Sequence, residues 1–194
     1  PPGGGRNPIT PRLVRQFHVL SCAAQSVDSM RSIFDAILGG FLSAFTDEVR
    51  SLSSKLVSAS VSLYDRVTKE LLPTPSKSHY TFNLRDLSKL IQGMLMITPN
   101  NCAEPETLIL LWCHEACRVF CDRLVDDTDR GWFYDLIKSL LQKNLSIERD
   151  SSVFSDVLFG DYQDRESRVY VKIEDDSKLA PLLQSIQEEY VIEL

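Results

Sequence analysis

NLRDLSKLIQGML, residues 83–95, is the stretch that most clearly decides the fold. After Asn83, leucine, isoleucine and methionine recur at intervals of three and four residues, which is the spacing of one face of an α-helix. Asn83 is a favourable N-cap, and Asp86, three positions later, can return a hydrogen bond to it. The stretch therefore predicts an amphipathic helix from residue 84, with the cation Arg85 in its first turn.

Helical spacing of apolar residues recurs on both sides of this stretch. It predicts further helices over residues 11–15, 27–38, 47–71, 108–125, 127–143 and 178–190. The pair Gly39-Gly40 is expected to end or kink the second of these. Alternating apolar residues predict a strand at 17–22 and, from a weaker pattern, another at 169–173. The predicted fold class is mostly α, with a remnant of a sheet at the N-terminal end.

Composition and charge exclude several classes of protein. The chain has 194 residues, 43% hydrophobic and 25% charged, which is enough apolar side chain for a core. Its net charge is −6 with both signs interspersed, so no basic face favours nucleic acid. No apolar run approaches the roughly 18 to 20 residues that cross a bilayer. Five cysteines, an odd number, suit a reducing compartment. We expect a cytosolic protein with no nucleic acid and no membrane as partner.

The first eleven residues, PPGGGRNPITP, lack an initiator methionine and are dense in glycine and proline. Such a run is typical of the interior of a protein, so we expect a piece of a longer polypeptide. Three glycines before Arg6 could let backbone N–H groups approach a phosphate. A Walker A loop ends in Gly-Lys-Ser/Thr, whereas Arg-Asn-Pro follows here. The run therefore predicts a connecting loop rather than a nucleotide cradle.

Cys113, His114, Cys117 and Cys121 form the densest cluster of reactive side chains. Four-residue spacing puts the three cysteines on one face of a helix, where they could ligate zinc. Zinc sites usually draw ligands from a Cys-x-x-Cys turn and a second element, so we interpret the cysteines as core residues and predict no metal site. A catalytic pair of a cysteine with a distant histidine is conceivable, but no local signature supports it.

Two arginines lie at the ends of predicted helices. Arg15 ends a short helix just before a predicted strand, where its guanidinium could reach a phosphate across an interface. A surface salt bridge is the alternative for this residue. A cation at the N-terminus of a helix is destabilising because it opposes the helix dipole, and Arg85 holds such a position. An anion bound at that N-terminus would remove this energetic cost.

Three separated motifs resemble the dynein heavy chain family: PPGGGRNPITPRLVRQF at 1–17, LLPTPSKSHYTFNLRDLSKLIQGML at 71–95 and LWCHEACRVFCDRLVDDTDRGWF at 111–133. They occur in the order found in the third AAA+ module of these motors. The first motif looks more like axonemal dyneins, of an inner-arm type, than the cytoplasmic form.

This resemblance implies the C-terminal part of an AAA+ (P-loop NTPase) module. Residues 1–24 would be the end of the large α/β subdomain, with its short helix and strand. Residues 25–144 would form the α-helical lid, and 145–194 a lid extension or linker towards the next module. Walker A, Walker B and the sensor-1 residue would lie upstream, so the chain alone is expected to be inactive and to hold no cofactor.

The resemblance also implies roles for individual arginines. Arg15 matches the position that offers an arginine finger to the nucleotide of the preceding module, and Arg12 is the runner-up. Arg85 matches the sensor-2 position, which reaches the phosphate of the module's own nucleotide. Arg6 would be a further interface contact.

The parent protein implied by the resemblance is a minus-end-directed microtubule motor that hydrolyses ATP with Mg²⁺. Its partners would be neighbouring AAA+ modules of the same heavy chain, microtubules, and dynein intermediate and light chains. Its location would be the cytoplasm, the cytoskeleton and the axoneme of a cilium or flagellum. From the residues alone, a non-catalytic helical interaction module and a zinc-binding helical domain stay open. Apolar surface that the upstream part would cover also predicts self-association of the isolated chain.

Overall fold

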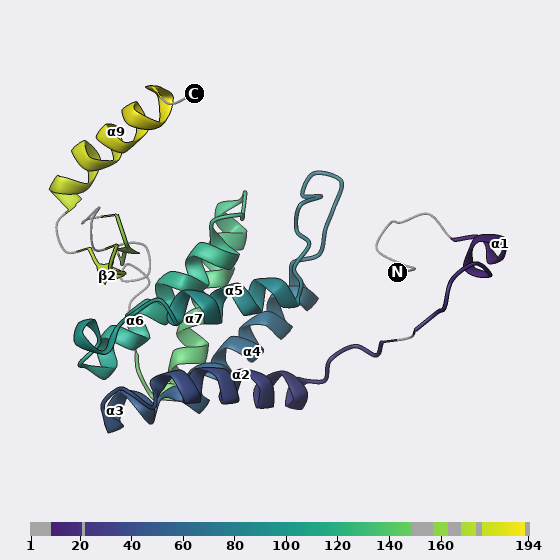
Figure 1. Cartoon of the computed structure of the whole chain (residues 1–194), viewed down its shortest axis with the longest axis horizontal. Coiled ribbons are helices and arrows are strands. Elements are labelled where there is room, and N and C mark those ends of the chain that lie inside the picture. Colours follow the sequence, from purple (N-terminus) through teal and green to yellow (C-terminus); the bar gives the residue numbers. More distant parts are fainter. Residues whose placement is uncertain (1–8, 21, 149–156, 163–167, 174–175, 193–194) are drawn as a thin grey trace.

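The computed structural model describes residues 9–20, 22–148, 157–162, 168–173 and 176–192. An N-terminal arm with α1 leads into a body of helices, which a two-stranded hairpin and a C-terminal helix follow (Figure 1). The elements are α1 (Pro11–Val14), α2 (Val27–Leu42), α3 (Asp47–Arg50), α4 (Ser53–Glu70), α5 (Leu84–Met94), the 3-10 helix η1 (Pro99–Asn101), α6 (Pro105–Ala116), the π-helix η2 (Cys117–Cys121), α7 (Asp127–Leu145), β1 (Phe159–Gly160), β2 (Val171–Lys172) and α9 (Asp176–Ile192). The mostly α fold class is thereby confirmed.

Helix α4 lies at the centre of the body, because α2, α5, α6 and α7 all pack against it. Its buried apolar residues recur at helical spacing through Leu56, Val61 and Val67. Each apolar side chain removed from water there contributes about 1.5 to 3 kcal/mol. Trp112 of α6 and Phe133 of α7, two of the largest fully buried side chains, add their rings to the same core as α4.

A buried hydrogen-bond chain joins α6 to α4 inside this core. The indole Nε1 of Trp112 donates to Ser60 Oγ at 2.8 Å, and Ser60 Oγ donates to the Leu56 carbonyl oxygen at 2.7 Å. The buried Trp112 Nε1 and Ser60 Oγ atoms therefore both have hydrogen-bond partners, as burial requires.

Helix α2 corrects one expectation, because it continues through Gly39-Gly40 and ends at Leu42. Leu38 and Leu42 are both completely buried, one turn apart on the same face. This packing outweighs the roughly 1 kcal/mol that a helical glycine costs relative to alanine. Ser26 caps the helix by accepting a hydrogen bond from the Ser29 backbone N–H.

The prediction of one continuous helix over 47–71 is wrong, because the first part forms a separate short helix. Helix α3 stops at Arg50, and α4 begins at Ser53. The Ser51 hydroxyl donates to the Glu48 carbonyl oxygen at 2.7 Å, and the Leu52 N–H bonds to the Val49 carbonyl oxygen. These local bonds close a turn that competes with continuation of the helix.

The strand predicted at 17–22 is not formed by residues 17–20 or 22. An extended segment needs a neighbour to bond its backbone groups, and no described strand lies beside the arm. The sheet is instead at the C-terminal end, where β1 and β2 pair antiparallel with Phe159 opposite Lys172. The strand predicted over 169–173 is thus confirmed in its centre, and the predicted N-terminal sheet remnant is wrong.

The remaining helices agree with expectation apart from their ends. Pro105 opens α6, and the last turn before residue 122 is a π-helix, in which the Asp122 N–H bonds to the Cys117 carbonyl oxygen. Helix α7 begins at Asp127 after the N-cap Asp126, and α9 contains the helix predicted over 178–190. Residues 153–156, part of a short apolar stretch, lie outside the described residues. None of the described helices has the length and apolarity of a membrane span.

Candidate functional site

The start of α5 is fixed by a reciprocal cap. The Asn83 side chain accepts a hydrogen bond from the Arg85 backbone N–H at 2.8 Å, and the Asp86 carboxylate accepts one from the Asn83 N–H at 2.9 Å. The predicted N-cap and its partner three residues later are therefore confirmed. Both bonds hold Arg85 in the first turn of α5.

Asp86 also anchors this turn to the segment after α6. Its carboxylate, only 4% exposed as a residue, accepts a second bond from Arg123 Nη2 at 2.8 Å. The Arg123 guanidinium lies 5.0 Å from the centre of the Phe82 ring, a cation–π contact. The Arg123 carbonyl oxygen is 3.0 Å from His79 Nε2. The first turn of α5 and the loop before it are thus tied at three points to one arginine.

A second group of contacts ties the same loop to the start of α7. The Lys77 ammonium contacts the carboxylates of Asp126 and Asp129, and the Tyr80 hydroxyl donates to Asp129 at 2.8 Å. Tyr80 in turn accepts a bond from the Val125 N–H at 3.0 Å. The two carboxylates raise the pKa of Lys77, and Lys77 lowers the pKa of Asp129. The pair is therefore ionised at neutral pH and holds the loop in place.

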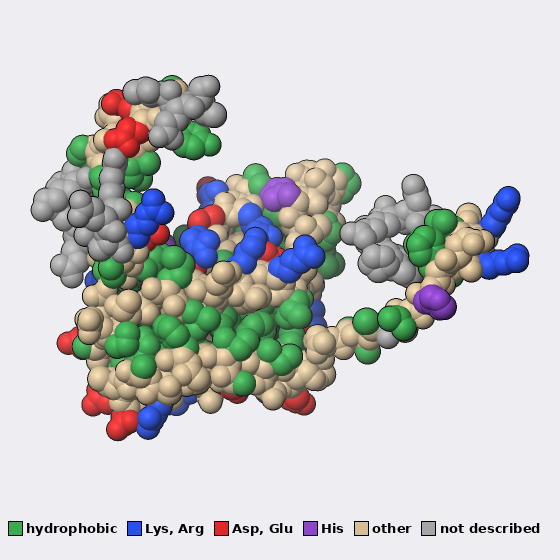
Figure 2. Space-filling view, viewed as in Figure 1, with side chains coloured by type: hydrophobic (Ala, Val, Ile, Leu, Met, Phe, Trp, Pro, Cys, Tyr) green, Lys and Arg blue, Asp and Glu red, His purple; other side chains and the backbone are tan. Residues whose placement is uncertain are grey.

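Arg85 itself points to solvent from this well-held turn. It is exposed, and its side chain has no hydrogen-bond or ion-pair partner in the part of the chain that the structure describes. Lys89, one turn further along α5, is also exposed. Figure 2 shows Lys and Arg side chains gathered on the surface of the body near α5. Cations at the N-terminus of a helix form a favourable approach for an anion such as phosphate.

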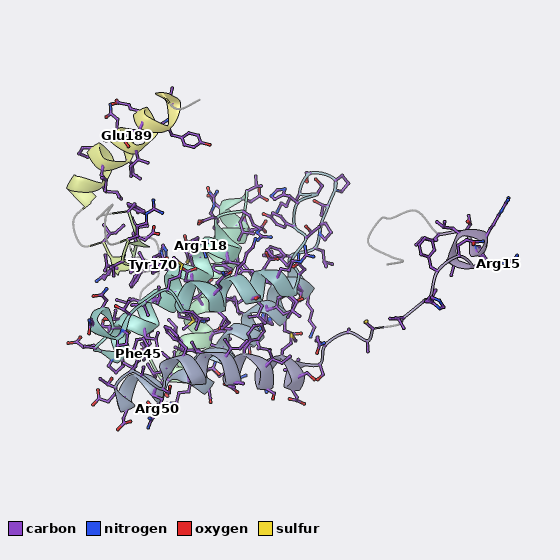
Figure 3. All side chains as sticks on the ribbon, in the orientation of Figure 1. Arg15, Phe45, Arg50, Arg118, Tyr170 and Glu189 are labelled. Atoms are coloured by element: carbon purple, nitrogen blue, oxygen red, sulfur yellow. The ribbon has the colours of Figure 1, made fainter. Side chains whose placement is uncertain are left out.

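The other predicted arginines lie elsewhere. Arg12 is in α1 and Arg15 is its C-cap, and both are exposed. Figure 3 shows Arg15 in the N-terminal arm, well away from the helical body that carries α5. Arg6 lies outside the described residues. The structure therefore does not bring Arg15 and Arg85 to one site.

The cysteine and histidine cluster packs as part of the core and its edge. Cys113 and Cys121 are buried, and burial raises the pKa of Cys117 and of Cys121. Such thiols stay protonated and are poor nucleophiles. His114 Nδ1 lies 3.1 Å from the Val157 carbonyl oxygen. Among the described residues, no three or more His, Cys, Asp or Glu side chains are placed to hold a metal ion.

Sequence reasoning missed a buried carboxylate on α6. Glu115 is completely buried, accepts bonds from Arg118 Nε at 2.9 Å and Nη2 at 2.6 Å, and accepts one from the Tyr170 hydroxyl at 2.6 Å. The available signal was a glutamate, with an arginine three residues later, inside an otherwise apolar helix. Figure 3 shows Arg118 and Tyr170 near each other, between the body and the hairpin.

Comparison with known proteins matches this helical body to one family. Residues 30–130 match the family described as dynein heavy chain, ATPase lid domain. The chain is 42% identical over 196 residues to human dynein axonemal heavy chain 6, 41% identical over 204 residues to human dynein axonemal heavy chain 1, and 36% identical over 211 residues to human dynein axonemal heavy chain 12. Each alignment covers 98% of the chain but only 5%, 5% and 7% of the relative, so the chain spans a small part of these relatives.

Proposed function

The chain belongs to the dynein heavy chain family, and on that premise we propose that it supplies the lid of a regulatory AAA+ module in an ATP-driven, minus-end-directed microtubule motor. The observation that carries the proposal is Arg85. Its backbone is fixed by the capping box, the helix start is tied to Arg123, the preceding loop is tied to α7, and its guanidinium is left exposed. A rigidly mounted, unpaired cation is what a sensor of a phosphate group requires.

Arg85 would act as the sensor-2 residue of its own module. A guanidinium on the lid that contacts the phosphates of ATP favours one orientation of the lid over another. Loss of the terminal phosphate removes part of that differential contact, so the lid can rotate as a rigid body. The helices packed around α4 suit this role, because they share one hydrophobic core.

Arg15 would act on a different nucleotide, the one bound in the preceding module of the ring, with Arg12 as the runner-up. An arginine supplied from a neighbour stabilises negative charge on the transferred phosphate. Arg6 would add an interface contact. The exposed position of Arg15 on an arm that extends from the body supports a contact outside this chain.

The wider proposal follows the order of motifs along the chain. The module is the third AAA+ module, with residues 1–24 ending the large subdomain, 25–144 forming the lid and 145–194 leading to the next module. ATP or ADP with Mg²⁺ would bind mainly through upstream Walker residues, so the isolated chain is inactive. The partners are adjacent AAA+ modules, microtubules, and intermediate and light chains, in the cytoplasm and the axoneme.

The decisive test is Arg85→Ala in a heavy chain that carries this segment, with Lys55→Ala as the matched control. Lys55 is an exposed cation in the first turn of α4, a different helix from the one that carries Arg85. Arg85→Ala should weaken ATP binding or hydrolysis at this module about tenfold or more, as expected for a lost charge-assisted contact, and Lys55→Ala should not. Equal nucleotide affinity in both variants would favour the alternative, a non-catalytic helical interaction module.

A second test uses the isolated chain with a fluorescent ATP analogue and Mg²⁺. We expect no saturable binding, because one lid arginine without the upstream phosphate loop is too weak a site. Saturable binding in the micromolar range would mean that a complete nucleotide site lies within these residues, and the proposed position in the module would be wrong.

A further inference from the structure

The hairpin of β1 and β2 is attached to the helical body by contacts that end on two consecutive residues of α6. His114 Nδ1 meets the Val157 carbonyl oxygen at 3.1 Å, and the His114 ring lies 5.6 Å, centre to centre, from the Phe159 ring. The Tyr170 hydroxyl donates to Glu115 Oε1 at 2.6 Å. The Phe159 and Tyr170 rings stack on each other at 6.1 Å, so both strands share one attachment.

The same Glu115 carboxylate lies against α5 on another side. A Cβ atom added at Gly93 would fall 2.0 Å from Glu115 Oε2 and 2.1 Å from its Cδ, well inside any tolerable contact. Gly93 is therefore required by the close approach of α5 to this carboxylate. Gly93 lies eight residues after Arg85, about 12 Å along the same helix.

Because Glu115 is a buried carboxylate, the contacts between α5, α6 and the hairpin tolerate little displacement. The side chain is completely buried, and it accepts hydrogen bonds from Arg118 and Tyr170. A buried carboxylate that loses a partner keeps its desolvation penalty, so the arrangement resists small displacements of any single member. Arg118 belongs to η2, the π-helical turn that directly follows α6, and π-turns recur at functional positions.

We propose that Glu115 is a positioning residue that couples α5 to the hairpin, so that a displacement of the Arg85-bearing helix is transmitted to residues 157–162 and 168–173. A shift of α5 would move Glu115 through its close contact with Gly93, and Glu115 would in turn move the hairpin through its hydrogen bond from Tyr170. The event that would displace α5 is nucleotide binding at Arg85, so this part of the inference rests on the proposed function. The mechanical link needs no nucleotide and can be tested without one.

The test is hydrogen–deuterium exchange of the full chain, read in peptides from α5, from the hairpin and from α2. Tyr170→Phe removes one hydroxyl, and Tyr190→Phe on α9 is its control, since Tyr190 is 65% exposed. Gly93→Ala is paired with Gly131→Ala in α7, where an added Cβ meets nothing within 4 Å.

Tyr170→Phe should raise exchange about tenfold in the hairpin, because a bond to a charged group is lost, and should also raise it in the last turns of α5. Gly93→Ala should raise hairpin exchange although residue 93 belongs to another element. The double variant should exchange no faster than the faster single one, because both changes break the same link. Both control variants should match the wild type, and α2 should be unchanged throughout.

Two results would overturn the coupling. The first is hairpin exchange at the wild-type rate in Gly93→Ala with its helices intact by circular dichroism. The second is Tyr170→Phe raising exchange in the hairpin but not in α5, a result that stays available if Gly93→Ala does not fold. A failure of Arg85→Ala to change nucleotide binding, with the link intact, would speak against the proposed function of Arg85 and leave the coupling standing.

Discussion

At the scale of single residues, Asp86 shows how one side chain can combine local and long-range roles. One carboxylate oxygen caps α5 through the Asn83 N–H, and the other pairs with Arg123, 37 positions along the chain. The first role follows from spacing and could be predicted from sequence. The second depends on how α6 and α5 pack, which no local pattern records.

Asp86→Asn should lower the free energy of unfolding by about 1 to 3 kcal/mol, because the amide keeps an acceptor for the cap but leaves the Arg123 charge without its counterion. Urea denaturation followed by circular dichroism measures the change. Asp47→Asn is the control: Asp47 pairs with Arg50 but its side chain is 88% exposed, so the change should be under about 1 kcal/mol. Equal effects at the two positions would contradict the buried role of Asp86.

His114 gives the chain a defined dependence on pH. Burial lowers the pKa of His114 below its ordinary value of 6.5, although Glu115 opposes the shift. At pH values between the lowered pKa of His114 and 6.5, the unfolded chain binds more protons than the folded one. The free energy of unfolding therefore decreases as the pH falls through this range, and His114 does not reduce it above pH 6.5. Urea midpoints taken from about pH 7.5 to about pH 5.5 should therefore decrease.

The variant His114→Asn should flatten this slope, because asparagine keeps a donor for the Val157 carbonyl oxygen but does not titrate. A slope that persists in His114→Asn would assign the dependence to another group.

The roles of Glu115 and Gly93 could not be predicted from the sequence. Each looks ordinary in the sequence: a polar residue in a helix and a glycine near a helix end. Their roles arise because the side chain of one occupies the space that a Cβ of the other would need. Such a relation is a property of packed helices and cannot be found from spacing along one of them.

At the scale of elements, local signals located the helices well and their interruptions poorly. The cap at Asn83 is a sufficient signal for α5, and the apolar spacing over 108–125 is sufficient for the existence of α6 but not for its ends. The double glycine in α2 was a misleading signal, because burial of Leu38 and Leu42 overrides it. The break between α3 and α4 is made by a serine hydroxyl that bonds to a nearby carbonyl, a choice that propensity alone leaves open.

The link between α4 and α6 is testable through Ser60→Ala. Removing this hydroxyl leaves the buried Trp112 Nε1–H without an acceptor, which should cost about 1 to 3 kcal/mol of stability. Ser54→Ala, at an exposed position of the same helix, should change stability by less than about 0.5 kcal/mol. Thermal unfolding compares the two, and a Ser60→Ala variant as stable as Ser54→Ala would show that the bond contributes nothing.

At the scale of the whole molecule, the described chain is a packed body with two extensions of different kinds. The arm carries Arg15 but buries none of the residues of α1. The hairpin, by contrast, is joined to the body through a buried charge. A displacement of α5 therefore has a structured path towards the hairpin, whereas no residue of α1 is buried against the body.

The body also leaves apolar side chains exposed, and this determines how the isolated chain should behave. On α2, Val27 is 38%, Ile33 49% and Ile37 44% exposed, next to the stripe that packs inward. Figure 2 shows hydrophobic side chains gathered on one face of the body. A continuous apolar face of this kind is typical of a surface that is covered in an assembly.

We therefore expect the isolated chain to self-associate as its concentration rises, and the variant Ile33→Lys/Ile37→Lys to shift the equilibrium towards monomer. The two side chains are one turn apart on the same helix face, so lysine there removes apolar area and adds mutual repulsion between copies. Sedimentation velocity over a range of concentrations measures the effect, and Ser32→Lys on the same helix controls for added charge alone. A wild-type chain that stays monomeric, or a control that dissociates as fully as the double variant, would show that this face does not drive association. Because the replaced side chains are already solvent-exposed, the helical content should not change, which separates lost association from lost folding.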